Sequence, residues 1–251
     1  MRNPVNQDNL CPFINSTCIK RSQKIAGPYP VCSIYKGGKG GVLGDLVCVC
    51  PKRFFQAELI DDVIKHCWPE KKKEDLHIAY EVKMKGFGQV DFVLADLDTK
   101  RRIKDFLSVE LQAIDITGSC ETAYSAVVNS RVLDKKPSYG FNYANVRKRY
   151  ISQLIAKGFF HHHWKTRIIA VIQDHLYTQF RTFLNFDELP VASSNIVFML
   201  YRFATDRNGN HQLVFDRAVG TSHNSLMMGT LYRNPPSRDE FCERILKQIR
   251  D

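Results

Sequence analysis

The 251-residue chain is 44% hydrophobic and 25% charged, which is typical of a globular protein and enough for one well-packed domain with an appended subdomain. No stretch approaches the roughly 18 consecutive apolar residues of a membrane-spanning helix, and the N-terminus lacks the apolar segment of a signal peptide. We therefore expect a cytoplasmic protein with no membrane partner. Its formal net charge of +10 favours a polyanionic partner such as nucleic acid.

The first fifty residues are rich in glycine and proline turns and hold five of the eight cysteines: Cys11, Cys18, Cys32, Cys48 and Cys50. In a reducing compartment such crowding favours metal ligation over disulfides. Four thiolates bind Zn²⁺ or Fe tetrahedrally and leave no open position, so a structural metal is expected. Its candidate ligands are Cys11, Cys18, Cys32 and Cys50, with Cys48 competing for the fourth place. The scattered cysteines are interpreted as small buried hydrophobes: Cys67, Cys120 and Cys242.

Beyond this segment the hydrophobic patterns predict regular elements. In chain order these are a helix at 53–67, strands at 77–84, 89–97 and 106–116, helices at 120–133 and 140–158, strands at 167–172, 195–203 and 211–216, and a helix at 238–250. The last helix is preceded by Ser237, with Glu240 at the spacing of a capping box. This order predicts a mixed α/β or α+β core.

Three further motifs receive ordinary interpretations. The glycine-rich run 36–41 lacks the Gly-Lys-Ser/Thr ending of a phosphate-binding loop and is predicted to be a turn. The run His161–His163 is predicted to be a polar loop after Gly158. The basic run Arg147–Arg149 on a predicted helix is a candidate for phosphate contact.

Two candidate catalytic carboxylates lie in the strand-rich middle of the chain. Glu110 and Gln112 are two residues apart, so a strand places both on one face. If the neighbouring strands pair through the turn at 98–102, Asp91 and Glu110 converge. Two such carboxylates repel each other unless a cation joins them, and they suit Mg²⁺, which can activate water for phosphodiester hydrolysis. Glu81, on the preceding strand, is a candidate third carboxylate, and exposed strand-end residues are the alternative interpretation.

Taken together, these residues resemble the NotI-type restriction endonucleases. The resemblance covers residues 11 to about 158. It is carried by Cys11–Lys20, Val31–Ser33, Cys50–Arg53, Asp91, Glu110–Gly118 and Gly140–Arg149. The cysteine frame and the Glu-x-Gln-x-Ile-Asp-Ile-Thr-Gly stretch are specific in combination, whereas neither is specific alone.

The resemblance implies a PD-(D/E)XK-like nuclease core with a mixed sheet flanked by helices at 71–251, and a four-cysteine metal-binding subdomain and helix at 1–70. It implies a homodimeric type II restriction endonuclease of a restriction-modification system, with a cognate DNA methyltransferase as its companion. Such an enzyme uses Mg²⁺ to cut both strands of double-stranded DNA at a GC-rich palindrome.

The resemblance also implies the roles of individual residues. Asp91, Glu110 and Gln112 would form the active site, and Cys11, Cys18, Cys32 and Cys50 would hold one iron. Cys50 rather than Cys48 matches, because the family's fourth cysteine is followed by proline. A lysine usually stands where Gln112 does in the broader PD-(D/E)XK group. Gln112 cannot carry a charge, so it is expected to orient the attacking water and leave activation to the metal.

Two alternatives stay open at this point. A repair nuclease could use the same core. A non-catalytic DNA-binding regulator stabilised by its cysteine metal would use the basic surface and would need neither Asp91 nor Glu110.

Overall fold

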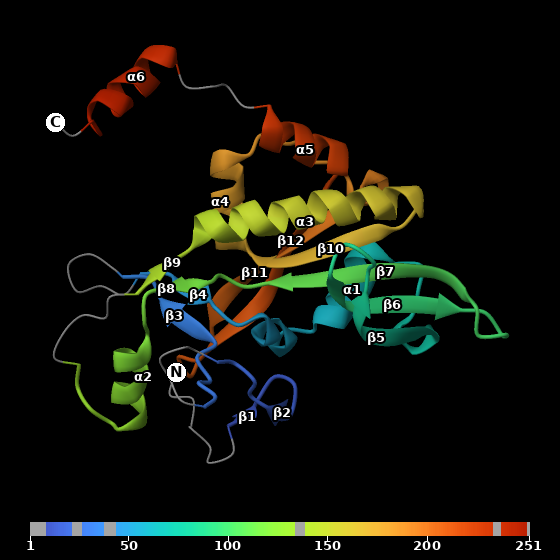
Figure 1. Cartoon of the computed structure of the whole chain (residues 1–251). Coiled ribbons are helices and arrows are strands. Elements are labelled where there is room, and N and C mark those ends of the chain that lie inside the picture. Colours follow the sequence, from blue (N-terminus) through green and yellow to red (C-terminus); the bar gives the residue numbers. More distant parts are fainter. Residues whose placement is uncertain (1–8, 22–26, 38–43, 134–138, 233–236, 250–251) are drawn as a thin grey trace.

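In the computed structural model, a six-stranded mixed β-sheet forms the centre of the molecule (Figure 1). The structure describes residues 9–21, 27–37, 44–133, 139–232 and 237–249. Across the sheet the strands are β12 (His211–Thr221), β11 (Ile196–Thr205), β10 (Arg167–Gln173), β7 (Ile103–Gln112), β6 (Gln89–Leu97) and β5 (Leu76–Lys83). The three central strands β7, β10 and β11 are parallel, and the outer strands pair antiparallel. The expected mixed α+β fold is confirmed.

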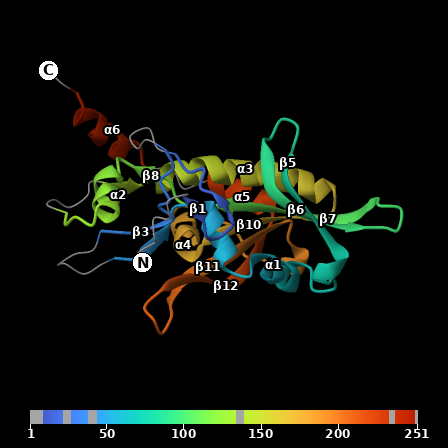
Figure 2. The ribbon, with the colours of Figure 1, turned by 90° about the horizontal axis from the view of Figure 1, so that it is seen from below.

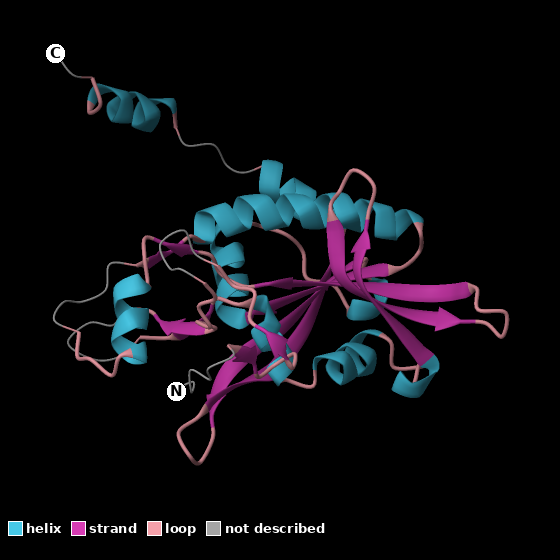
Figure 3. Ribbon diagram, turned by 60° about the horizontal axis from the view of Figure 1, so that its bottom comes forward, coloured by secondary structure: helices cyan, strands magenta, loops and turns pink. Residues whose placement is uncertain are grey.

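Helices cover both faces of this sheet, as Figures 2 and 3 show from two directions. The helices and helical turns are η1 (Pro51–Gln56), α1 (Leu59–Cys67), η2 (Lys73–Asp75), α2 (Glu121–Val128), α3 (Tyr143–His163), α4 (Asp174–Phe183), η3 (Val191–Ser193), α5 (His223–Leu231) and α6 (Arg238–Leu246). Alternate residues of β10 enter different cores: Ile168 packs with α3, α4 and α5, whereas Ile169 packs with η1 and α1. A strand buried on both faces is continuously apolar, as its sequence is.

The remaining strands form short two-stranded pairs outside the main sheet. They are β1 (Leu10–Cys11) with β2 (Ser16–Thr17), β3 (Ser33–Tyr35) with β4 (Leu46–Cys48), and β8 (Ile116–Thr117) with β9 (Gly140–Phe141). The side chain of Gln173 attaches β4 to the end of β10. Its Oε1 accepts from the Cys48 N–H at 2.9 Å and its Nε2 donates to the Leu46 carbonyl at 2.8 Å. The cysteine-rich segment is therefore joined directly to the sheet.

Several predicted elements differ from the observed ones. The helix expected at 53–67 divides into η1 and α1, and the helices α4 and α5 were not predicted. The loop expected at His161–His163 is wrong, because α3 continues through His163. Gly158, which suggested a break, is inside the helix at a close approach to β11: a Cβ there would lie 2.7 Å from Ile196 Cδ1. Part of the glycine-rich run, 38–43, lies outside the described residues.

The capping box of the last helix is confirmed, because the Ser237 side chain accepts from the Glu240 N–H and the Glu240 carboxylate accepts from the Ser237 N–H. α6 buries none of its residues. Within the described ranges, no helix has the length and apolar character needed to cross a membrane.

Candidate active site

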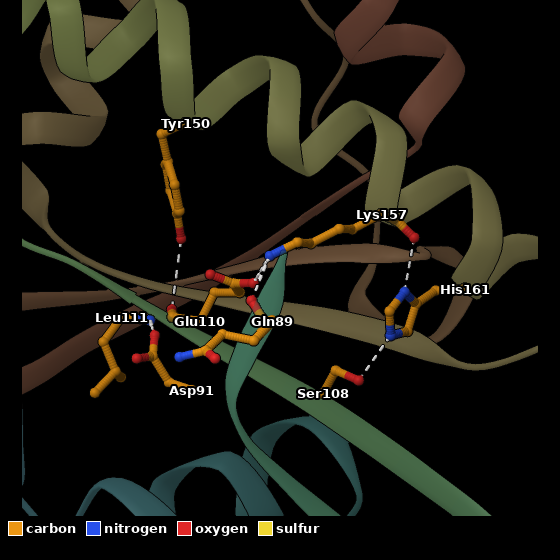
Figure 4. A network of polar contacts seen from close by, with 8 residues as sticks. All are labelled: Gln89, Asp91, Ser108, Glu110, Leu111, Tyr150, Lys157 and His161. Carbon is orange, nitrogen blue, oxygen red and sulfur yellow. Dashed lines mark hydrogen bonds and ion pairs between the residues drawn. The ribbon is translucent and has the colours of Figure 1, made fainter. Parts of the chain in front are cut away.

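Asp91 and Glu110 lie on neighbouring strands, directly beyond the last residue pair of the β6–β7 ladder. Phe92 pairs with Val109, and the strands are antiparallel. Asp91, which precedes Phe92, is therefore opposite Glu110, which follows Val109. The Leu111 N–H donates to Asp91 Oδ2 at 2.8 Å, which fixes the carboxylate against β7 (Figure 4). The apolar neighbours of Asp91 explain its location, since Val90 and Phe92 are both buried. The two carboxylates are thus brought together by the strand pair predicted from the sequence.

The face of β7 that carries Glu110 is turned toward α3. Val109 and Leu111 belong to the core beneath η1 and α1, so the alternation of a strand directs Glu110 to the opposite face. There the Glu110 carboxylate, in a residue only 8% exposed, forms an ion pair with Lys157 of α3 (Figure 4). The Lys157 ammonium also donates to the Gln89 carbonyl at 2.7 Å. Sequence reasoning missed Lys157.

The surroundings of Glu110 have opposing effects on the pKa of its carboxyl group. Burial raises the pKa of the Glu110 carboxyl above its ordinary value, and the charge of Asp91 raises it further. The hydrogen bond and positive charge of Lys157 act against both effects. The Tyr150 hydroxyl donates to the Glu110 carbonyl at 3.4 Å, and burial keeps the pKa of Tyr150 well above its ordinary value, so this hydroxyl stays protonated.

A buried histidine extends the polar network beyond Lys157. His161 Nδ1 lies 2.7 Å from the Lys157 carbonyl, and Nε2 lies 2.8 Å from Ser108 Oγ. Burial lowers the pKa of His161 to about 4, so the ring is neutral at physiological pH. Because a carbonyl only accepts, Nδ1 carries the hydrogen and Nε2 accepts from the Ser108 hydroxyl. His161 therefore adds no second positive charge to the site.

The two remaining candidate residues are less constrained. Gln112 lies on the Glu110 face of β7, half-buried, and its amide nitrogen donates to the Ala113 carbonyl. Glu81 lies between Tyr80 and Val82, whose partners on β6 flank Asp91, so it is opposite Asp91 in the ladder. Its side chain is exposed and its φ is +53°, an uncommon conformation for a residue other than glycine. Such outliers gather at functional sites.

The cysteines expected to hold a metal are only partly gathered. The Cys32 and Cys50 thiols share a hydrogen bond, which lowers the pKa of Cys50 to about 6 and raises that of Cys32. The Cys48 Sγ instead donates to the Cys50 carbonyl at 3.3 Å. Over the parts of the chain that are described, no group of three or more His, Cys, Asp or Glu side chains is arranged to hold a metal ion.

A comparison with protein families shows which family this chain is related to. The model of the family described as restriction endonuclease NotI matches residues 4–214. The chain belongs to the NotI restriction endonuclease family. The match extends past residue 158, where the sequence resemblance faded, through β10 and β11 into β12. No curated protein matches the chain.

Membership of the NotI family implies a site-specific restriction endonuclease, a type II deoxyribonuclease that hydrolyses DNA. The matched span of this NotI-family chain contains Asp91, Glu110 and the helix that carries Lys157. The family match and the buried polar site therefore fall in the same part of the molecule.

Proposed function

We propose that this NotI-family protein cuts both strands of double-stranded DNA at a GC-rich palindrome in a Mg²⁺-dependent reaction, with Asp91 and Glu110 as the metal ligands. The observation that supports this most is the adjacent placement of the two carboxylates on β6 and β7. Mg²⁺ is usually held by one or two protein carboxylates together with substrate phosphates, so this pair has the right donor chemistry. Glu81 is proposed as an auxiliary carboxylate.

Each residue of the site has a defined task in this proposal. The Leu111 N–H occupies one oxygen of Asp91 and Lys157 contacts one oxygen of Glu110, so each carboxylate keeps a second oxygen for a cation. When bound, Mg²⁺ would activate a water and stabilise the charge that develops on the scissile phosphate. Gln112, which is uncharged, would orient the attacking water by hydrogen bonding.

Plasmid DNA incubated with the purified protein and Mg²⁺ should give discrete fragments, and a chelator should prevent their formation. Sequencing of the fragment ends should place both strand breaks in one palindrome. A gel shift without any strand breakage would instead support the DNA-binding regulator. Breakage that follows DNA damage or structure, with no sequence preference, would support the repair nuclease.

A palindrome presents two strands related by a two-fold axis, and a two-fold protein is the simplest match to it. We therefore also propose a homodimer, with twice the chain mass of 28.9 kDa in light scattering, and a cognate methyltransferase that protects the same site.

The four-cysteine metal is a separate part of the proposal. Cys11, Cys18, Cys32 and Cys50 would hold one structural Fe or Zn, and none of them forms a disulfide. The fit is incomplete, since Cys32 and Cys50 are in contact while the four do not form a ligand group. Metal binding would require the four thiols to come together.

Cys18→Ser should abolish binding of about one metal per chain and lower the melting temperature, because the loop-rich segment would lose its cross-link. Elemental analysis and thermal melts measure the two effects. Cys48→Ser is the matched control and should retain the metal. Metal-free protein with all its thiols reactive in the native state would contradict the proposal.

A further inference from the structure

A lysine ammonium is buried at the centre of the candidate active site. The Lys157 side chain is 3% exposed and contacts the Glu110 carboxylate and the Gln89 carbonyl. A charged group is rarely buried unless it is paired, because removal from water is unfavourable. Here the carboxylate and the carbonyl together compensate the ammonium and hold it in one place (Figure 4).

We propose that Lys157 is a positioning residue of the nuclease site. It holds the Glu110 carboxylate through one oxygen, so that the other oxygen is presented to the metal and the scissile phosphate. This inference rests on the proposed Mg²⁺-dependent cleavage. It deepens that proposal by adding to the site a residue that lies 47 positions from Glu110 in the sequence.

The charges of the site give this role a measurable signature. Asp91 and Glu110 contribute two negative charges, Lys157 contributes one positive charge, and His161 is neutral. Without Lys157 the site becomes more negative, so it should attract a divalent cation at least as strongly. Its Glu110 ligand would no longer be held in place, so the chemical step should slow. A lysine that only fastened α3 to the sheet would affect stability, cation binding and cleavage together.

The test compares Lys157→Met, Lys157→Arg and the control Lys104→Met. Lys104 is an exposed lysine near the start of β7, the strand that carries Glu110. Single-turnover cleavage is measured at saturating Mg²⁺ and pH 8, and Mn²⁺ binding without DNA is followed by electron paramagnetic resonance. Lys157→Met should slow cleavage by about 100-fold, the effect of a misplaced catalytic group. Its affinity for Mn²⁺ should equal or exceed that of the parent.

Lys157→Arg keeps the positive charge and should recover about tenfold of the lost rate, and Lys104→Met should cut at the parental rate. If Lys157→Met does not fold, Lys157→Gln, which keeps N–H donors but no charge, replaces it with the same expectations. The inference is overturned by parental cleavage in the uncharged variant, by a parallel loss of Mn²⁺ affinity, or by an arginine variant no better than methionine. A parent protein that cuts no DNA would contradict the proposed function itself.

Discussion

Asp91→Asn and Glu110→Gln should each reduce DNA cleavage by roughly three orders of magnitude. Each change removes a charge that the cation needs, and a metal ion contributes several kcal/mol of transition-state stabilisation, which corresponds to about 10³-fold in rate. Specific DNA binding in Ca²⁺ should survive, because each variant removes a negative charge that faces the phosphate. A cleavage time course beside a gel-shift assay, across a Mg²⁺ titration, measures both properties.

The two variants should differ in stability. Asp91 is half-buried, and in Asp91→Asn the amide oxygen can still accept from the Leu111 N–H, so stability should change little. Glu110→Gln leaves the buried Lys157 ammonium without a negative charge beside it, and breaking a buried ion pair from one side destabilises proteins by about 3–5 kcal/mol. Thermal melts must therefore accompany the assays. Asp61→Asn, which breaks an exposed ion pair with Lys73, is the matched control and should cut normally. Parental rates for Asp91→Asn and Glu110→Gln would place the active site elsewhere.

Gly229→Ala should lower the free energy of unfolding, although alanine normally favours a helix over glycine by about 1 kcal/mol. Gly229 is buried in α5, and a Cβ there would lie 2.2 Å from the Asn185 carbonyl oxygen and 2.6 Å from its carbon. Because both atoms are backbone, the clash can be relieved only by moving α5 or the chain after α4. Overpacking of this kind costs about 1–3 kcal/mol.

Urea unfolding followed by circular dichroism measures the effect of Gly229→Ala, and we expect a loss of about 2 kcal/mol. Met228→Ala alters the preceding residue of the same helix, which is 50% exposed, and should change stability little. A Gly229→Ala variant as stable as the parent would mean that α5 packs less closely than described.

The main sheet could be predicted from the sequence because its strands have strong local patterns. The strand at 89–97 agrees with β6 at both ends, and the apolar runs of β10 and β11 were also found. The helix α4 was missed because it begins at Asp174, directly after β10 ends at Gln173, with no glycine or proline to mark the boundary. The helix α5 was missed because Gly229, which suits its close packing, weakens the helical pattern.

The candidate site could be predicted only as far as local spacing reaches. Glu110 and Gln112 share a strand, and Asp91 follows from the pairing of adjacent strands. Lys157 depends on how α3 crosses the sheet, and no periodicity in the sequence reports that crossing. A lysine in a helical pattern is normally assigned to the solvent face. The available signal was the position of Lys157, three residues after Leu154 and therefore on the helix face that is otherwise mostly apolar and buried.

Two contacts between α3 and β7 also fix the position of the helix along the strand. Lys157 contacts Glu110, and His161 contacts Ser108, so a step of four residues along the helix matches a step of two along the strand. Four residues of a helix span about 6.0 Å and two residues of a strand span about 6.6 Å. The two distances are nearly equal, so both contacts can form at once when the helix runs antiparallel to the strand. Sliding α3 by one turn would bring Lys157 opposite Ser108 and Gln153 opposite Glu110, leaving the carboxylate without a cation. The two contacts therefore oppose a shift of α3 by one turn in this direction along β7.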